Sequence, residues 1–335
     1  MLFLNQSDTN GSNKTQNVRN VSDASNGVSR TASTISNIPN MFNFDHKVNK
    51  SFWFFVLPGL LLVFAVLVYP IFYAIYMSMY DWNLFNQISR KFIFLQNYIR
   101  LFNDNEFIHS LLLQLGFIFI ALPIETIIGF LVALLLNREG RFYSVARSLL
   151  LLPVFILPVI SGLTWRMMLQ PEYGLVSYFL EKFGFGVKAW LAEPRFAYGM
   201  VIVQDVWRMW PFMFMFIYAG LSGLPKEYLE AAQIDGAGFW TKVFKIIIPY
   251  LKPTVATAFL LRMIDALRIF SEVYVMTGGG PGNATLLLSL YINKQAFEFF
   301  NIGYAATMGV FLLAVSLIIA FVVVRGNIQF ESERG

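Results

Sequence analysis

Long apolar runs alternate with short polar segments from residue 52 onward. Six of these runs reach the length of about 20 residues that a helix needs to cross roughly 30 Å of hydrocarbon. They lie near 53–77, 108–136, 143–169, 197–221, 246–275 and 302–324. Because lipid offers no partner for an unpaired backbone group, each run is predicted to be helical, with prolines such as Pro153 and Pro211 tolerated as kinks. The pattern therefore predicts an all-α membrane protein with six spans.

The first 50 residues have a different composition from the rest of the chain. Asn, Ser and Thr supply 21 of them, with few apolar partners, which is typical of a disordered tail. We therefore divide the chain into a polar tail at 1–50, a six-helix membrane domain at 51–325 and a C-terminal tail at 326–335.

Composition excludes several classes of protein. The chain is 57% hydrophobic and 13% charged, against about 25% charged in an ordinary soluble domain, which excludes a cytosolic globular enzyme. Its net charge of +5 does not indicate nucleic-acid binding, because Lys and Arg lie mostly between the apolar runs. With no cysteine and only two distant histidines, His46 and His109, the sequence has no disulfide framework, metal-site motif or cysteine nucleophile. A membrane-embedded enzyme is therefore disfavoured.

Basic residues are unequally distributed between the two sides of the predicted spans. One side collects thirteen Lys and Arg residues from both tails, the 137–147 turn and the 224–245 loop, and the other side collects seven. The bias is strongest in the short turn, which holds Arg138, Arg141 and Arg147. By the positive-inside rule, both termini are predicted to face the cytoplasm.

The segment 224–249, between the fourth and fifth spans, is more ordered than a simple connection. Pro225 suits the first position of a helix, and Glu227 and Glu230 lie in its opening turns, where the helix dipole favours anions. Gly236 can end this helix in a left-handed conformation. The pattern predicts a short helix, a tight turn and a second helix that runs into the membrane.

This segment resembles the signature of the permease subunits of binding-protein-dependent ABC importers, which is Glu-Ala-Ala, three residues, Gly and an ending similar to Ile-x-Leu-Pro. The chain has Glu230-Ala231-Ala232, Asp235-Gly236-Ala237 and Ile246-Ile247-Ile248-Pro249, with Ile in place of the usual Leu. The resemblance implies a coupling helix that docks into a cleft on an ATP-binding subunit; an ordinary amphipathic interfacial helix is the alternative. The residues expected to make the contact are Glu230, Ala231, Ala232, Asp235, Gly236 and Ala237.

A second resemblance narrows the branch of the family. The glycine-rich run Thr277-Gly278-Gly279-Gly280-Pro281-Gly282 and the later string Asn301-Ile302-Gly303-Tyr304-Ala305-Ala306 are similar to segments of carbohydrate-importer permeases related to the larger maltose-type subunit. The glycine-rich run is not a phosphate cradle, because the P-loop string Gly-x4-Gly-Lys-Ser/Thr occurs nowhere in the chain. The ATPase is therefore expected on a separate polypeptide.

Together, these resemblances imply the fold of a six-helix type I ABC importer transmembrane domain in the lipid bilayer of a bacterial cytoplasmic (inner) membrane. They imply a second, similar permease subunit, two ATP-binding subunits and an extracytoplasmic solute-binding protein as partners. ATP and Mg are expected on the ATP-binding subunits, with no cofactor, catalytic residue or metal on this chain. The implied solute is a carbohydrate, meaning an oligosaccharide, a sugar or a polyol.

Charged residues inside spans are costly and indicate either a solute path or a buried pair. Eight charged or aromatic residues of the fourth and fifth spans are candidates for the path: Asp205, Trp207, Arg208, Trp210, Arg262, Asp265, Arg268 and Glu272. The four in the fifth span fall on one arc of about 120° of a continuous helix. Glu125 and Arg166 stand more alone. Two interpretations stay open, contact with a sugar or charges that only hold helices together.

The balance of charge bears on the solute. Four arginines in or near the spans are matched by four acids, which favours a neutral sugar or polyol but leaves open a uronate oligosaccharide or a glycerol phosphate. The rival class is a secondary transporter or channel that works without an ATPase. Such proteins commonly have inverted repeats, and the two halves of this sequence show no clear repeat.

Overall fold

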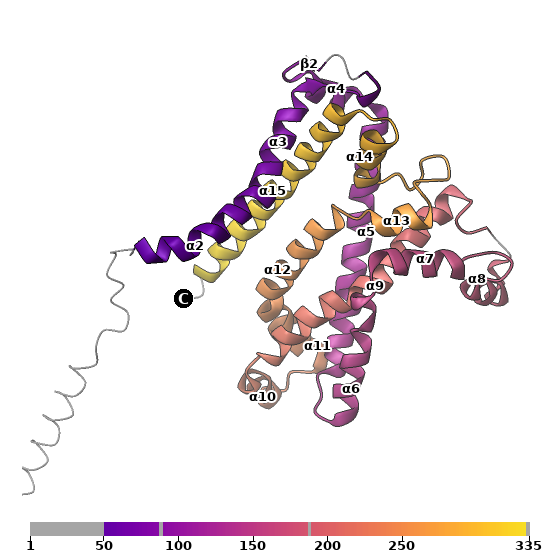
Figure 1. Ribbon diagram of the computed structural model, residues 1–335. Coiled ribbons are helices and arrows are strands. Elements are labelled where there is room, and N and C mark those ends of the chain that lie inside the picture. The colour runs from indigo at the N-terminus through magenta and orange to yellow at the C-terminus, as the bar shows by residue number, and fades with distance from the viewer. Residues whose placement is uncertain (1–49, 87–89, 187–188, 333–335) are drawn as a thin grey trace, which may run out of the picture. The chain divides into compact units, whose positions relative to one another are not determined.

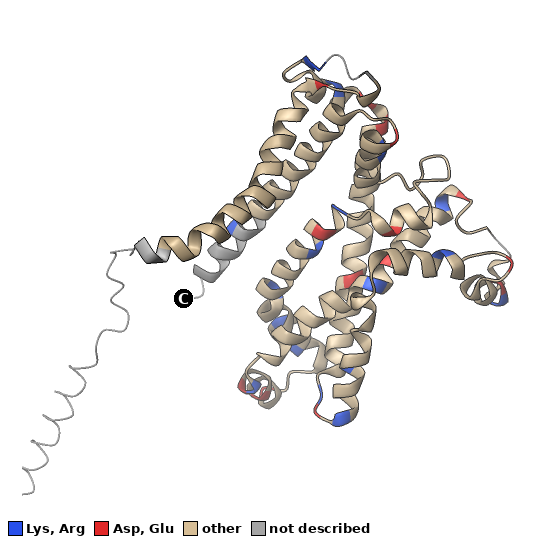
Figure 2. Ribbon diagram, in the orientation of Figure 1, with Lys and Arg blue, Asp and Glu red and all other residues tan. Residues whose placement is uncertain are grey.

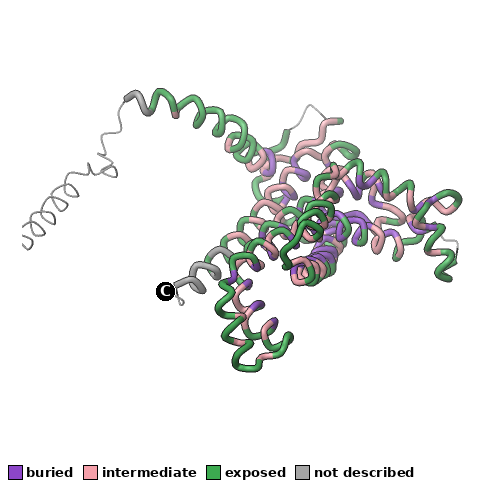
Figure 3. The backbone as a smooth tube through the Cα atoms, turned by 90° about the horizontal axis from the view of Figure 1, so that it is seen from below, coloured by how far each residue is buried: buried purple, intermediate pink, exposed green. Residues whose placement is uncertain are grey.

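The computed structural model describes residues 50–86, 90–186 and 189–332, so nearly all of the predicted polar tail lies outside the described residues. The chain divides into two compact units, Met1–Val66 and Leu67–Gly335. In the first unit, the described residues form α2 (Lys50–Val63) and the start of η1 (Phe64–Val68). The side chains described in α2 are nearly all apolar and exposed, as expected of a helix that faces lipid (Figure 3).

Five helices are long and apolar enough to cross a membrane, and they agree with five of the predicted spans. They cover Trp53–Ser78, Asn105–Leu136, Pro194–Ser222, Phe239–Ala266 and Ile302–Val322. The second and fourth spans are the single helices α5 (Asn105–Leu136) and α9 (Pro194–Ser222), with Pro123 and Pro211 inside them. The last span belongs to α15 (Ile302–Ser332), which continues through residue 326, where the C-terminal tail was predicted to start.

The third predicted span, 143–169, is not one straight helix. It consists of α6 (Arg141–Leu150), the short η3 (Leu152–Phe155) and α7 (Pro158–Met168), with a bend of 92° between its halves. Pro158 explains the break, because the residue before a proline is pushed out of the helical conformation, and Leu157 has ψ 135°. If the bent pair counts as one span, the described residues contain the six spans that the sequence predicts.

The fifth span is shorter than predicted. A continuous helix runs through α11 (Phe239–Lys242), η5 (Val243–Ile247) and α12 (Ile248–Ala266), and α13 (Ser271–Met276) is a separate short helix. The prediction that 246–275 form one helix, with four charged residues on one arc, is therefore wrong. At the break, the carbonyl of Ala266 accepts a hydrogen bond of 2.8 Å from Nε2 of Gln114 in α5. This bond satisfies one of the carbonyls that a helix end leaves without an intrahelical partner.

Two hydrophobic clusters form the core of the second unit, and α5 and α9 run through both. One cluster joins the first halves of these helices to α13, to α14 (Leu288–Phe297) and to α15. The other joins their second halves to η5 and α12. At Gly129 of α5 the two backbones come so close that a Cβ atom would lie 2.7 Å from the amide nitrogen of Phe214 in α9. Small residues that allow such an approach are typical of helix contacts in membranes.

Short elements connect the longer helices of the second unit. They are the paired strands β1 (Tyr80–Asp81) and β2 (Lys91–Phe92) with η2 (Leu84–Asn86) between them, α4 (Gln96–Asn103), α8 (Leu175–Leu180) and η4 (Glu181–Phe185). The helix α3 (Tyr69–Ser78) lies along α15 and leads into β1 (Figure 1).

Asp104, the N-cap residue of α5, joins three elements at the start of that helix. Its Oδ1 accepts hydrogen bonds from the amides of Glu106 and Phe107, at 2.9 and 3.3 Å. Its Oδ2 accepts from the hydroxyls of Tyr291 in α14 and Tyr304 in α15, at 2.8 and 2.6 Å. One carboxylate therefore both caps α5 and fixes the positions of α14 and α15.

Candidate functional site

The segment between the fourth and fifth spans has the predicted helix, turn and helix. α10 (Lys226–Ile234) ends before Gly236, whose φ is 77°, and α11 follows. The amide of Ala237 donates to the carbonyl of Ala232 at 2.8 Å, and the amide of Gly236 donates to that of Gln233 at 3.1 Å. This pair of bonds is a Schellman motif, which requires a residue in the left-handed conformation where the sequence has glycine.

Large apolar side chains of this segment point away from the protein. Ile234 is 87% exposed, and Tyr228, Phe239 and Trp240 are all more than half exposed. An apolar group displayed among polar residues is typical of a surface that binds another protein or the membrane. The six predicted contact residues share this accessible segment, with none buried: Glu230, Ala231, Ala232, Asp235, Gly236 and Ala237.

A cleft of about 510 Å³ lies beside α10, and its other wall is formed by the 137–147 turn and the end of α9. Leu229, Glu230 and Gln233 line it from α10. Across it, Nζ of Lys226 lies 3.3 Å from Oε1 of Glu139. The two basic loops that the positive-inside rule places on one side of the membrane are therefore at the same end of the helices (Figure 2).

Arg262 of α12 is buried among three carboxylates from different parts of the chain. Its Nε and Nη2 lie 2.9 and 3.0 Å from the two oxygens of Glu125 in α5. Nη2 also contacts Asp205 of α9, and Nη1 lies 3.2 Å from Oδ2 of Asp265. Glu125, which has no obvious partner in the sequence, thus forms a bidentate ion pair with Arg262.

Arg208 of α9 extends this network to α13. Its Nη2 lies 2.6 Å from Oε1 of Glu272 and 3.7 Å from Oδ1 of Asp205. Buried charges require such partners, because an isolated ion costs several kcal/mol in a protein interior. Asp205, Arg208, Arg262 and Glu272 are all buried, so their position supports the interpretation that they hold helices together. Among the described residues, no group of His, Cys, Asp or Glu is arranged to bind a metal ion.

The other four candidates for the path are more accessible or serve the core. Trp207 is 38% exposed, and its ring centroid lies 5.9 Å from that of Trp165 in α7. The side chain of Asp265 is 53% exposed, and Arg268 is also exposed. Trp210 packs against the second hydrophobic cluster. The structure therefore separates the eight residues into a buried network, three accessible side chains and one core residue.

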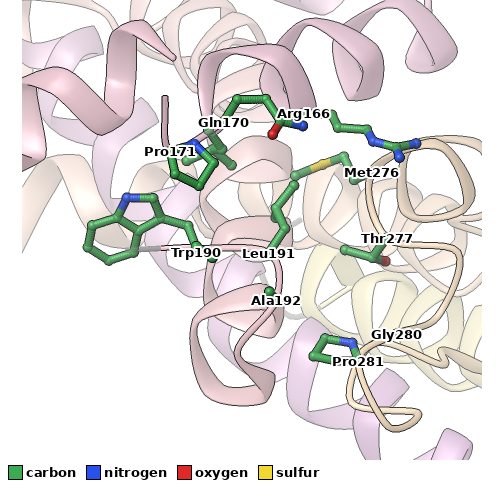
Figure 4. A pocket seen from close by; sticks show the side chains of 12 residues that line it. Arg166, Gln170, Pro171, Trp190, Leu191, Ala192, Met276, Thr277, Gly280 and Pro281 are labelled. Carbon is green, nitrogen blue, oxygen red and sulfur yellow. The ribbon is translucent and has the colours of Figure 1, made fainter. Parts of the chain in front are cut away.

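A second cavity, of about 440 Å³, lies near the beginning of α9, at the opposite end of that helix from the cleft (Figure 4). It is bounded by the end of α7, the 189–192 loop and the start of the glycine-rich run, with Arg166, Gln170 and Thr277 among its polar residues. Nη1 of Arg166 donates to the carbonyl of Val275 at 3.0 Å. Arg166 therefore fixes α7 to α13 and does not belong to the buried ion network.

Two buried amide side chains inside the predicted spans escaped the sequence analysis. Nε2 of Gln204 in α9 donates to Oγ of Ser161 in α7 at 2.8 Å, and Gln114 caps α12 as described above. A polar residue inside an apolar span is the sequence feature that marks both side chains, but the prediction considered only charged residues in the spans.

The profile of the family described as "Binding-protein-dependent transport system inner membrane component" matches residues 99–327. The chain belongs to this family. One relative of the permease is the trehalose/maltose transport system permease protein MalF of Thermococcus litoralis, 35% identical over 83% of this chain and 93% of the relative. Another is the sulfoquinovosyl glycerol transport system permease protein SmoG of Agrobacterium fabrum, 32% identical over 80% and 87%.

The permease also shares its fold with a solved transporter. A chain of a bacterial ABC transporter involved in the import of the acidic polysaccharide alginate superposes with a TM-score of 0.69 and 21% identity, covering 83% of the permease and 94% of that chain. Together with the family match, this likeness confirms the predicted fold class, a six-helix transmembrane domain of an ABC importer. The permease is a multi-pass membrane protein of this family of transport components.

Proposed function

We propose that this permease forms half of the translocation path for a carbohydrate in an ATP-driven importer. The transport systems named for MalF and SmoG handle trehalose, maltose and sulfoquinovosyl glycerol, all of which contain sugars. A second, similar permease completes the path, and an extracytoplasmic binding protein delivers the solute. Both termini lie in the cytoplasm, in agreement with the shared end of the two basic loops.

The observation that carries this proposal is the exposed segment formed by α10, the Gly236 turn and α11. A hydrogen-bonded turn with the exposed side chains of Ile234 and Trp240 is suited to bind another protein. Two separate ATP-binding subunits bind ATP and Mg, and one of them holds α10. To move a transporter from 1:99 to 99:1 between two states requires about 5.5 kcal/mol of differential binding, so α10 contacts its partner differently in the two states.

Within the path, the accessible side chains contact the solute and the buried network positions them. Trp207 offers an aromatic face, while Asp265 and Arg268 offer hydrogen-bonding groups for hydroxyls. Arg262 holds Asp265 through an ion pair, and Arg208 sets the position of α13 through its ion pair with Glu272. Trp210 supports α9 from the core and does not reach the solute.

Single-cysteine crosslinking tests the proposal, since the chain has no cysteine of its own. In the assembled transporter, Glu230→Cys is expected to crosslink to an ATP-binding subunit. Glu298→Cys, an exposed position after α14, is the matched control and is expected to give no such product. A homomer that transports without any ATPase, or a Glu230→Cys variant that never reaches one, contradicts the proposal.

The solute class is tested on the partner binding protein. Its thermal unfolding is measured against neutral sugars, polyols, uronate oligosaccharides and glycerol phosphates. We expect stabilisation by a neutral sugar or polyol, because the charges near the path are balanced within the permease. Stabilisation by glycerol phosphate alone contradicts the carbohydrate assignment.

A further inference from the structure

Arg147 of α6 closes the end of another helix. Its Nη1 donates to the carbonyl of Leu136, the last residue of α5, at 3.0 Å, and to that of Arg138 at 3.3 Å. The last four carbonyls of a helix have no intrahelical partner, and a basic side chain there satisfies them and interacts favourably with the helix dipole. Arg147 therefore fixes the geometry of the turn between α5 and α6.

The same guanidinium also joins this turn to α9. Its Cζ lies 4.8 Å from the centre of the Tyr218 ring, within the range of a cation–π interaction. One half-buried side chain thus connects the cytoplasmic ends of α5 and α9, the two helices that run through both hydrophobic clusters. We refer to Arg147 and Tyr218 together as the brace.

The brace faces α10 across the cleft. Arg147 and Tyr218 line one wall, and Leu229, Glu230 and Gln233 of α10 line the other. The ion pair that crosses the cleft, between Lys226 and Glu139, has side chains 80% and 93% exposed, and pairs of this kind contribute little. The apolar contact of Leu229 with the second hydrophobic cluster is therefore what joins α10 to the structure behind it.

We propose that Arg147 is a positioning residue for coupling, an inference that rests on the proposed function. By holding the ends of α5 and α9 as one body, the brace passes a displacement of α10 to both helices together. Those helices carry Glu125 and Asp205, the buried partners of Arg262, so both carboxylates move in step. Without the brace, α10 moves but α5 and α9 respond separately.

The test uses the complete transporter in proteoliposomes and measures ATP hydrolysed per solute imported. Arg147→Met, which keeps an unbranched, flexible apolar side chain but removes the donors and the charge, is expected to raise this ratio at least threefold. Arg147→Lys, which restores the charge and one donor, is expected to recover part of the loss. The exposed Arg141→Met, on the same helix, is the matched control and is expected to keep the wild-type ratio. A purely structural role lowers the amount of assembled complex but leaves the ratio unchanged.

A second pair of variants makes the test independent of how well Arg147→Met assembles. Tyr218→Phe keeps the ring and is expected to keep the ratio, whereas Tyr218→Leu removes it and is expected to raise the ratio. An unchanged ratio in Arg147→Met, or in Tyr218→Leu where the first does not assemble, overturns the inference. The Glu230→Cys crosslink, repeated in the Arg147→Met background, separates this failure from a failure of the proposed function. If the crosslink to an ATP-binding subunit forms but the ratio is unchanged, the inference about Arg147 fails and the proposed function stands. If no crosslink forms even with Arg147 present, the proposed function fails.

Discussion

Arg262 and Glu125 lie 137 positions apart in the chain and meet as a bidentate, fully buried ion pair between α12 and α5. Asp205 of α9 shares the same guanidinium, so one cation holds three membrane-spanning helices. Such a pair is a weak source of net stability, because desolvation opposes attraction, but it is expensive to break from one side. The pair therefore specifies which helices meet.

Removal of Arg262 is expected to destabilise the protein. Arg262→Met leaves Glu125 buried without a cation and leaves Asp205 with only Arg208, at 3.7 Å, which costs on the order of 3–5 kcal/mol. Thermal unfolding of the purified transporter in detergent measures the effect. The double variant Arg262→Met/Glu125→Leu is expected to recover part of the loss, and the exposed Arg268→Met to stay within roughly 0.5 kcal/mol of wild type. Equal unfolding temperatures for Arg262→Met and wild type would show that the network is dispensable.

Gly236 is expected to be essential for coupling. A side chain at its φ of 77° costs about 1–2 kcal/mol, and a β-branched one costs more, so Gly236→Val opens the Schellman turn. ATP hydrolysis is then expected to continue while solute uptake in proteoliposomes falls. Gly238→Ala is the control, because Gly238 has φ −67° and no atom within 4 Å of an added Cβ. Full uptake by Gly236→Val counts against the role of the turn.

Trp207 is expected to affect transport and not assembly. Trp207→Ala removes an accessible ring, and an aromatic contact contributes about 0.5–1.5 kcal/mol, so kcat/KM for uptake should fall roughly two- to tenfold. The yield of assembled complex should stay near wild type. Trp210→Ala, from the core side of α9, should instead reduce the yield. The proposed path is contradicted if the two variants behave alike.

Asp104 is expected to make the end of the unit near α14 sensitive to acid. Burial alone would raise its pKa, but hydrogen bonds from Tyr304, Tyr291 and the amides of Phe107 and Glu106 outweigh burial and hold the pKa below its ordinary value. A lowered pKa means that the charged form stabilises the fold above an unfolded-state pKa of about 4, and that this contribution is lost as pH falls through the folded value.

The matching experiment compares thermal unfolding of wild type and Asp104→Asn across pH. The difference in unfolding temperature should be largest above pH of about 5 and should shrink below pH of about 4. Tyr304→Phe removes one of the four donors and should show a smaller difference from wild type. A difference that grows as pH falls would reverse the sign and refute the account.

Local sequence was enough to predict the elements that depend on local physics. Hydropathy and length located the spans, because lipid admits only helices there, and the conformational freedom of glycine located the turn at Gly236. The 92° bend was harder, since Pro153, Pro158 and Pro211 all lie in predicted spans and only the one at 158 accompanies a full break. A proline in α9 is tolerated because the neighbouring helices pack around it.

The buried network could not be predicted in the same way. The sequence marked Arg262, Asp205 and Glu272 as unusual, but their partners come from other helices. The predicted arc of charges required a continuous helix over 246–275, whereas α12 ends at Ala266. No local pattern says that Glu125 faces Arg262, because that contact depends on how α5 packs against α9 and α12. Charge in a span predicts a constraint, while tertiary packing decides which one.

The bond from Gln114 to the carbonyl of Ala266 has a consequence for protein engineering. The end of α12 depends on a hydrogen-bond donor from α5, so the two helices cannot be exchanged independently of each other. A chimera that takes α5 from a relative but keeps its own α12 loses the donor to the carbonyl of Ala266, unless the relative carries an equivalent amide. Transplants between such transporters should therefore exchange both segments together.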